Sequence, residues 1–178
     1  ALVLTPTANT ITGTGTITLQ PATGSTTIGI GDGATGVFDL DAAEIAALSD
    51  GFSSITIGAS SGSGATDINA ITFTDVVTIR GGAMALTSLE AGSNNITLTS
   101  TSTIDEAADD TTVDITTSGT LALTAQGAIG ASGGGNNPLD LAVGTLQATT
   151  SNGGIFLLES SALTIGGSGV RTTASNAA

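Results

Sequence analysis

Short segments in which two apolar residues stand two positions apart recur along this chain. Thr, Ser, Ala and Gly fill most positions between and beside them. A period of two predicts β-strands with one buried face. Clusters of Gly, Asn, Asp and Ser, at 58–64, 92–95, 130–137 and 151–154, predict the corners between strands. The predicted strands contain the pairs Leu2/Leu4, Ile17/Leu19, Ile28/Ile30, Phe38/Leu40, Ile55/Ile57, Ile71/Phe73, Val77/Ile79, Met84/Leu86, Ile96/Leu98, Val113/Ile115, Leu121/Leu123, Leu139/Leu141, Ile155/Leu157 and Leu163/Ile165.

Scarce aromatic residues indicate how these strands are arranged. Sandwiches and barrels usually place aromatic side chains in a core about 10 Å thick, but this chain has four Phe and no Trp or Tyr. A parallel β-solenoid, whose turns stack about 4.8 Å apart, has a narrower core that β-branched residues can fill. We therefore predict an all-β fold, a single β-solenoid over 1–178. At roughly 20 residues per turn, it would have about eight or nine turns and a length of about 40 Å.

One segment departs from the strand pattern. Asp41 and Glu44 have the spacing of a capping box, in which each side chain accepts a hydrogen bond from the other residue's backbone N–H. Leu40 and Ile45 stand where a hydrophobic staple would pack. We predict a short helical insertion near Asp41–Leu48, laid against the side or end of the solenoid.

Composition excludes several classes of function. The 178 residues include no Cys and no His, so the chain cannot form disulfides, the usual zinc or haem sites, or a His-based catalytic triad. Two basic residues against fifteen acidic ones give a formal net charge of -13, which disfavours binding to nucleic acid and to anionic membranes. We therefore expect neither a nucleic-acid partner nor membrane insertion.

The apolar residues of the chain indicate whether it folds, whether it spans a membrane and whether it begins with a signal peptide. Apolar residues make up 39% of the chain, which argues against disorder. No apolar run approaches the about 18 residues needed to span a bilayer. The first four residues lack the basic region and the long apolar region of a signal peptide, so we expect the chain to begin within a larger protein or as a processed product.

Several runs along the chain share one repetitive texture of Thr, Gly and Ile. They are GTGTITLQP (13–21), TIGIG (27–31), LDAAEIAALSDGFSSITIG (40–58), ITFTD (71–75), VTI (77–79), NGGIFL (152–157) and LTIGGSGV (163–170). With these runs the chain resembles repeat modules of very large secreted bacterial surface proteins, the filamentous-haemagglutinin-like exoproteins and autotransporter passengers. This resemblance implies a right-handed parallel β-helix, secretion to the extracellular space or bacterial cell surface, and a role as a stalk, adhesin shaft or matrix component. It supplies no catalytic residues.

The densest acidic run contains Asp105, Glu106, Asp109, Asp110 and Asp114. Ca²⁺ takes six to eight oxygen ligands, and a loop with several carboxylates at a corner of the solenoid could supply some of them. The spacing matches no EF-hand, and the glycine-rich Ca²⁺-binding nonapeptide of other solenoids is missing. A solvated acidic loop is the preferred interpretation, and calcium binding is the alternative.

Nothing in the sequence predicts an enzyme. The glycine-rich segment 28–36 lacks the following helix and the Lys of a nucleotide-binding loop. Polysaccharide-acting solenoids need paired carboxylates, strong bases and aromatic platforms, but Arg80 and Arg171 are the only bases and Trp and Tyr are absent. We expect Arg80 to pair with an acidic residue on the next turn, and we assign no catalytic, cofactor-binding or metal-binding residue.

These observations favour a non-catalytic rod segment of a longer repetitive protein. The strand edges at the ends of a solenoid pair with further strands unless they are capped. Because neither end of the chain has the composition of a polar cap, we expect Ala1 and Ala178 to adjoin further turns or another copy of the module. Two alternatives remain, a calcium-stabilised ligand-binding module and a polysaccharide-acting β-helix enzyme.

Overall fold

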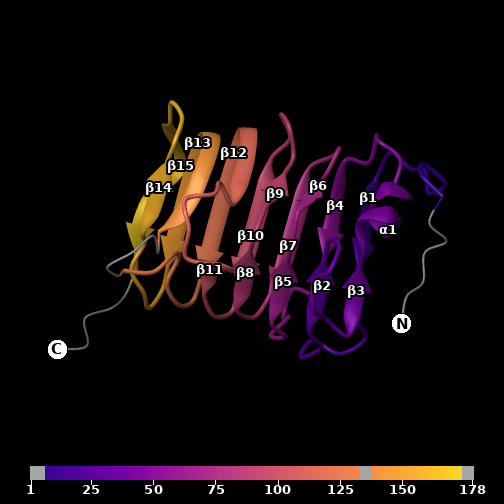
Figure 1. Ribbon diagram of the computed structural model, residues 1–178, viewed down its shortest axis with the longest axis horizontal. Helices are drawn as coiled ribbons and strands as arrows, with labels where there is room; N and C mark the ends of the chain where they lie inside the picture. Colours follow the sequence, from indigo (N-terminus) through magenta and orange to yellow (C-terminus); the bar gives the residue numbers. More distant parts are fainter. Residues whose placement is uncertain (1–6, 133–137, 174–178) are drawn as a thin grey trace.

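Parallel strands are the main regular element of the computed structural model, which describes residues 7–132 and 138–173. Strand accounts for 47% of the residues and helix for 3%. The strands stack along the long axis of Figure 1 and form a β-solenoid of about five turns, which confirms the predicted all-β, parallel β-solenoid fold. The strands are β1 (Thr16–Leu19), β2 (Ile28–Ile30), β3 (Phe38–Leu40), β4 (Ser54–Ile57), β5 (Thr66–Ile68), β6 (Ile71–Thr72), β7 (Val77–Gly81), β8 (Met84–Leu86), β9 (Leu89–Glu90), β10 (Ile96–Ser100), β11 (Ile104–Glu106), β12 (Ile115–Ala125), β13 (Leu139–Thr150), β14 (Leu157–Glu159) and β15 (Thr164–Thr172).

Three ladders of hydrogen-bonded strands run along the solenoid. The longest has the order β1-β4-β7-β10-β12-β13, and β15 pairs with β13 at its end. The second has the order β3-β2-β5-β8-β11. The third begins with β6 and β9 and continues through the first parts of β12 and β13 to β14. Strands β12 and β13 are therefore long enough to take part in two ladders each.

Turns of the solenoid differ in length. Pairing of Val77 with Ile96 and of Ile96 with Leu121 means that successive turns advance by 19 and 25 residues. The first turn advances by 38 residues, because Thr16 pairs with Ser54. The prediction of eight or nine turns is wrong: there are about five. At about 4.8 Å per turn the length is about 25 Å rather than 40 Å, because an insertion and long corners take up residues without adding turns.

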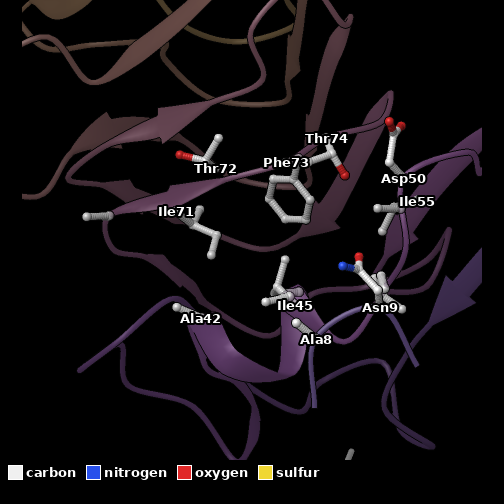
Figure 2. A pocket seen from close by; sticks show the side chains of 13 residues that line it. Ala8, Asn9, Ala42, Ile45, Asp50, Ile55, Ile71, Thr72, Phe73 and Thr74 are labelled. Atoms are coloured by element: carbon white, nitrogen blue, oxygen red, sulfur yellow. The ribbon is translucent and has the colours of Figure 1, made fainter. Parts of the chain in front are cut away.

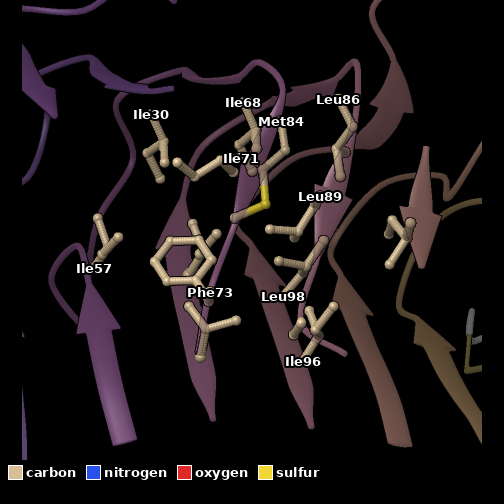
Figure 3. Close-up of a cluster of buried hydrophobic side chains, with 14 of the residues drawn as sticks. Ile30, Ile57, Ile68, Ile71, Phe73, Met84, Leu86, Leu89, Ile96 and Leu98 are labelled. Atoms are coloured by element: carbon tan, nitrogen blue, oxygen red, sulfur yellow. The ribbon is translucent and has the colours of Figure 1, made fainter. Parts of the chain in front are cut away.

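Core side chains form columns along the solenoid axis. Ile57, Ile79, Leu98 and Leu123 stand in one such column, one from each of four successive turns, and none is more than 2% exposed. Figure 3 shows Ile57 and Leu98 in this aliphatic core, with Phe73 among the few aromatic side chains. Partly exposed residues, mainly threonines, occupy the alternate positions of β7 and β10. This arrangement explains both the period of two and the scarcity of aromatic residues.

The predicted helical insertion is present as α1 (Ala42–Ala46) at the N-terminal end of the solenoid (Figure 1). The Asp41 carboxylate accepts a hydrogen bond from the Glu44 backbone N–H at 2.7 Å, and the Glu44 carboxylate accepts one from the Asp41 N–H at 3.2 Å. Ile45 is buried, as a hydrophobic staple requires. Within the described ranges, no helix has the length and apolar character needed to cross a membrane.

Strand β3 and helix α1 belong to one insertion between β2 and β4. Strand β3 pairs with β2 on the side away from β5, so it forms the N-terminal edge of the second ladder. The insertion thus covers part of the N-terminal end of the solenoid. The predicted strand at Leu2/Leu4 and the termini Ala1 and Ala178 lie outside the described residues.

A glycine is required at the corner after β4. Gly58 has a φ of 89°, a conformation that residues with a Cβ rarely adopt. A Cβ at this position would also overlap the backbone carbonyl oxygen of Arg80 on the next turn. Close stacking of turns, as well as turn geometry, therefore selects glycine in the predicted corner 58–64.

Candidate functional site

Three carboxylates from two successive turns converge at one corner of the solenoid. Glu106 is the last residue of β11, Asp114 directly precedes β12, and Asp140 is the second residue of β13. One carboxylate oxygen from each of the three residues lies within 4.8 Å of the other two. Asp114 and Asp140 are each only 4% exposed, and Glu106 is partly buried. We call these three residues the carboxylate cluster.

Glu106 stands in a column that is otherwise aliphatic. The parallel register places it beside Leu86, which lies beside Ile68, which in turn lies beside Ile30. All three of these neighbours are fully buried. A carboxylate therefore occupies a position at which the three preceding turns carry core side chains.

Asp114 and Asp140 are held against each other by backbone hydrogen bonds. The backbone N–H of Asp114 donates to the Asp140 carbonyl oxygen at 2.9 Å. In return, the Asp140 N–H donates to one carboxylate oxygen of Asp114 at 2.9 Å. These bonds continue the register in which Ile115 pairs with Leu141. The ladder itself therefore places the two aspartates side by side.

Several carboxylate oxygens of the cluster are buried without a hydrogen-bond partner. They are both oxygens of Glu106 and the Oδ2 atom of Asp140. The Asp110 backbone N–H lies close enough to Glu106 to lower its pKa, but it does not reach hydrogen-bonding geometry with either oxygen. A buried charged group without a partner is strongly unfavourable, so the cluster must bind something or take up protons.

The electrostatics of the cluster follow from this burial. The pKa of Asp114 is raised to about 7: burial is the largest cause, and the neighbouring charges of Glu106, Asp140 and Asp110 add to it, while the Asp140 N–H acts in the opposite direction. Burial likewise raises the pKa of Glu106, which Asp109, Asp140 and Asp105 raise further. Burial and the charge of Asp110 raise the pKa of Asp140.

Only part of the acidic run predicted from the sequence joins the cluster. Asp105 instead accepts a hydrogen bond from the Glu106 N–H at 3.1 Å, and burial raises its pKa. Asp109 and Asp110 lie on the exposed loop between β11 and β12. The Asp110 carboxylate accepts from the Thr112 N–H at 2.5 Å, which lowers its pKa. The sequence did not reveal Asp140, because its 26-residue separation from Asp114 has meaning only once the turn length is known.

Two larger cavities lie on the solenoid, and Glu106 of the carboxylate cluster lines the second of them. One of about 570 Å³ lies between α1 and β6 and is lined by Ile45, Ile71 and Phe73, as Figure 2 shows. In the described residues β6 pairs only with β9, so this cavity lies where α1 replaces a strand. The other, of about 820 Å³, covers the outer face of the second ladder and has no aromatic side chain in its lining. Its Asp67 carboxylate accepts hydrogen bonds from the Thr35 N–H and hydroxyl at 2.7 and 2.8 Å.

The C-terminal end of the solenoid exposes an apolar strand edge. Within the described ranges, β14 and β15 pair only with β13, so their outer edges carry unpaired backbone groups. Five large apolar side chains are exposed in the described structure, and four of them belong to this last turn. We call these four the C-terminal edge: Leu158 (49% exposed), Leu163 (37%), Ile165 (54%) and Val170 (44%).

Comparison with family models, with curated proteins and with solved structures finds no match. The carboxylate cluster and the C-terminal edge are the two features of this chain that bear on its function.

The two arginines lie in register with neutral residues. Arg80 pairs with Thr99 on the next turn, so the residue directly beside it there is neutral rather than acidic. Arg171 pairs with Thr149. Neither arginine is therefore placed by the ladder beside a carboxylate of the cluster.

Proposed function

We propose that this chain is a structural, non-catalytic rod segment of a secreted bacterial surface or extracellular-matrix protein. The parallel solenoid fold supports this proposal, because such a fold extends by adding turns and presents long faces for display. The resemblance of its repeats to adhesin shafts and filament-forming modules supports the location. Cell adhesion or a place in a biofilm matrix would follow from that location.

The C-terminal edge is the observation that carries the proposal. Four exposed apolar side chains on one turn, next to unpaired strand edges, form a surface that a further parallel turn would bury. The partner of this surface is a further turn of the same protein. In the isolated segment a second copy would take that place, and head-to-tail contacts of this kind build open filaments.

Analytical ultracentrifugation of residues 1–178 tests this proposal. The wild-type segment should associate with increasing concentration, and electron microscopy should show end-to-end particles. The double variant Ile165→Lys/Val170→Lys should remain monomeric, because two charges on the edge oppose strand pairing. Val37→Lys is the matched control, since Val37 is 76% exposed and lies outside the last turn.

Circular dichroism of each variant would check that the fold is retained. A wild-type segment that is monomeric at all concentrations contradicts the proposal. Equal loss of association in Val37→Lys and in the double variant also contradicts it, because the effect would then come from charge alone.

A further inference from the structure

The carboxylate cluster has the dimensions of a cation site. Its three side chains offer oxygens within 4.8 Å of one another. Two oxygens that each lie about 2.3 to 2.6 Å from one Ca²⁺ ion can be no more than about 5.2 Å apart. We propose that Glu106, Asp114 and Asp140 together bind one Ca²⁺ ion, which joins two successive turns of the solenoid. This inference does not rest on the proposed function.

Unpartnered buried oxygens provide a second, independent reason. Asp140 is only 4% exposed, and its Oδ2 has no hydrogen-bond partner. Both oxygens of Glu106 are also buried without a partner, in a column of core side chains. Solvated acidic residues expose their carboxylate oxygens to water, but these three oxygens, both of Glu106 and Oδ2 of Asp140, are buried. A bound cation would supply the missing partner of all three oxygens at once.

The available ligands select the kind of cation. The chain has no His and no Cys, so the site offers only oxygen, which suits hard cations such as Ca²⁺ and Mg²⁺. Side chains on neighbouring strands are spaced by about 4.8 Å, which is about twice the Ca²⁺–oxygen distance and more than twice the Mg²⁺–oxygen distance of about 2.1 Å. Strand spacing therefore favours Ca²⁺.

A small cavity beside the cluster provides room for the remaining ligands. It has a volume of about 110 Å³ and is lined by Asp110, Thr112 and Asp114, among others. This volume is large enough for water molecules, which commonly complete a Ca²⁺ site with six to eight oxygens. The cavity also connects the cluster to the exposed acidic loop, whose charges would attract a cation.

Titration with CaCl₂ after treatment of the full chain with EGTA tests the proposal. Because Ca²⁺ would bind the folded state only, about 5 mM CaCl₂ should raise the melting temperature of the wild type by several degrees. Isothermal titration calorimetry should give a stoichiometry of one. Glu106→Gln and Asp140→Asn should each weaken Ca²⁺ binding at least tenfold, and MgCl₂ should be a weaker ligand than CaCl₂.

Glu90→Gln is the matched control, because Glu90 also ends a short strand but is exposed. This variant should respond to Ca²⁺ as the wild type does. A wild-type melting temperature that is the same in EGTA and in CaCl₂ overturns the proposal. An equal rise in the wild type, Glu106→Gln and Glu90→Gln also overturns it, since Ca²⁺ would then only screen the net charge of the chain.

Discussion

Removal of one core side chain should show how rigidly the turns are stacked. Leu98 is fully buried in β10 and lies in register between Ile79 on one neighbouring turn and Leu123 on the other. Leu98→Ala removes three carbon atoms from this column. The ladder hydrogen bonds keep the adjacent turns about 4.8 Å apart, so neighbouring strands cannot move in to fill the space.

The expected loss follows from these contacts. Three buried carbon groups at about 0.8 kcal/mol each account for about 2.4 kcal/mol of lost transfer free energy. A persistent cavity adds to this value, so Leu98→Ala should lower the free energy of unfolding by about 4 kcal/mol. Leu158→Ala is the comparison, because Leu158 is 49% exposed at the last turn. It should cost less than about 1 kcal/mol in dilute solution.

Urea denaturation followed by circular dichroism would measure both variants at a concentration at which the wild type is monomeric. Equal slopes of the unfolding transitions would show that the two variants unfold as the wild type does. A loss below about 1 kcal/mol for Leu98→Ala would refute the reasoning, because it would mean that the turns can close around the gap. An equal loss for the two variants would refute it as well.

Two further predictions concern the carboxylate cluster and the helix. In EGTA, the free energy of unfolding should fall by about 3 kcal/mol from pH 5 to pH 8, since the pKa of Asp114 is about 7 when folded and 3.8 when unfolded, and the folded chain loses its extra proton in this range. Thermal unfolding at several pH values would show this slope, and Asp114→Asn should reduce it. Asp41→Ala should lower the free energy of unfolding by about 1 kcal/mol, because it removes the cap of α1. Limited proteolysis should then cut the insertion between β2 and β4 (31–53) faster, an effect that Asp50→Ala should not produce.

Strands with a pair of apolar residues two positions apart could be predicted from the sequence, and most of the described strands contain such a pair. Three others, β5, β9 and β11, were not predicted. In β9 only Leu89 is buried, and β11 carries Glu106 where the pattern expects an apolar residue. These strands form because the turns on either side offer them a ladder to pair with. Tertiary pairing, rather than local pattern, determines them.

Helix α1 could be predicted from a few neighbouring residues. Its capping box needs only Asp41 and Glu44 at the correct spacing, so a few consecutive residues specify it. The number of turns could not be obtained in this way, because residues in corners and in the insertion have no fixed period. The partner of Asp114 could not be predicted either, because the length of the turn determines that Asp140 lies beside it.

The sequence by itself determined that this protein is an all-β solenoid with a narrow aliphatic core, because alternation and composition act within each short segment. Only the tertiary structure decided which segments lie side by side, since register depends on the length of every corner between them. That register brings Glu106, Asp114 and Asp140 together and leaves the last turn with an exposed apolar edge. Both features on which the proposals rest are therefore properties of stacked turns, and no single segment contains them.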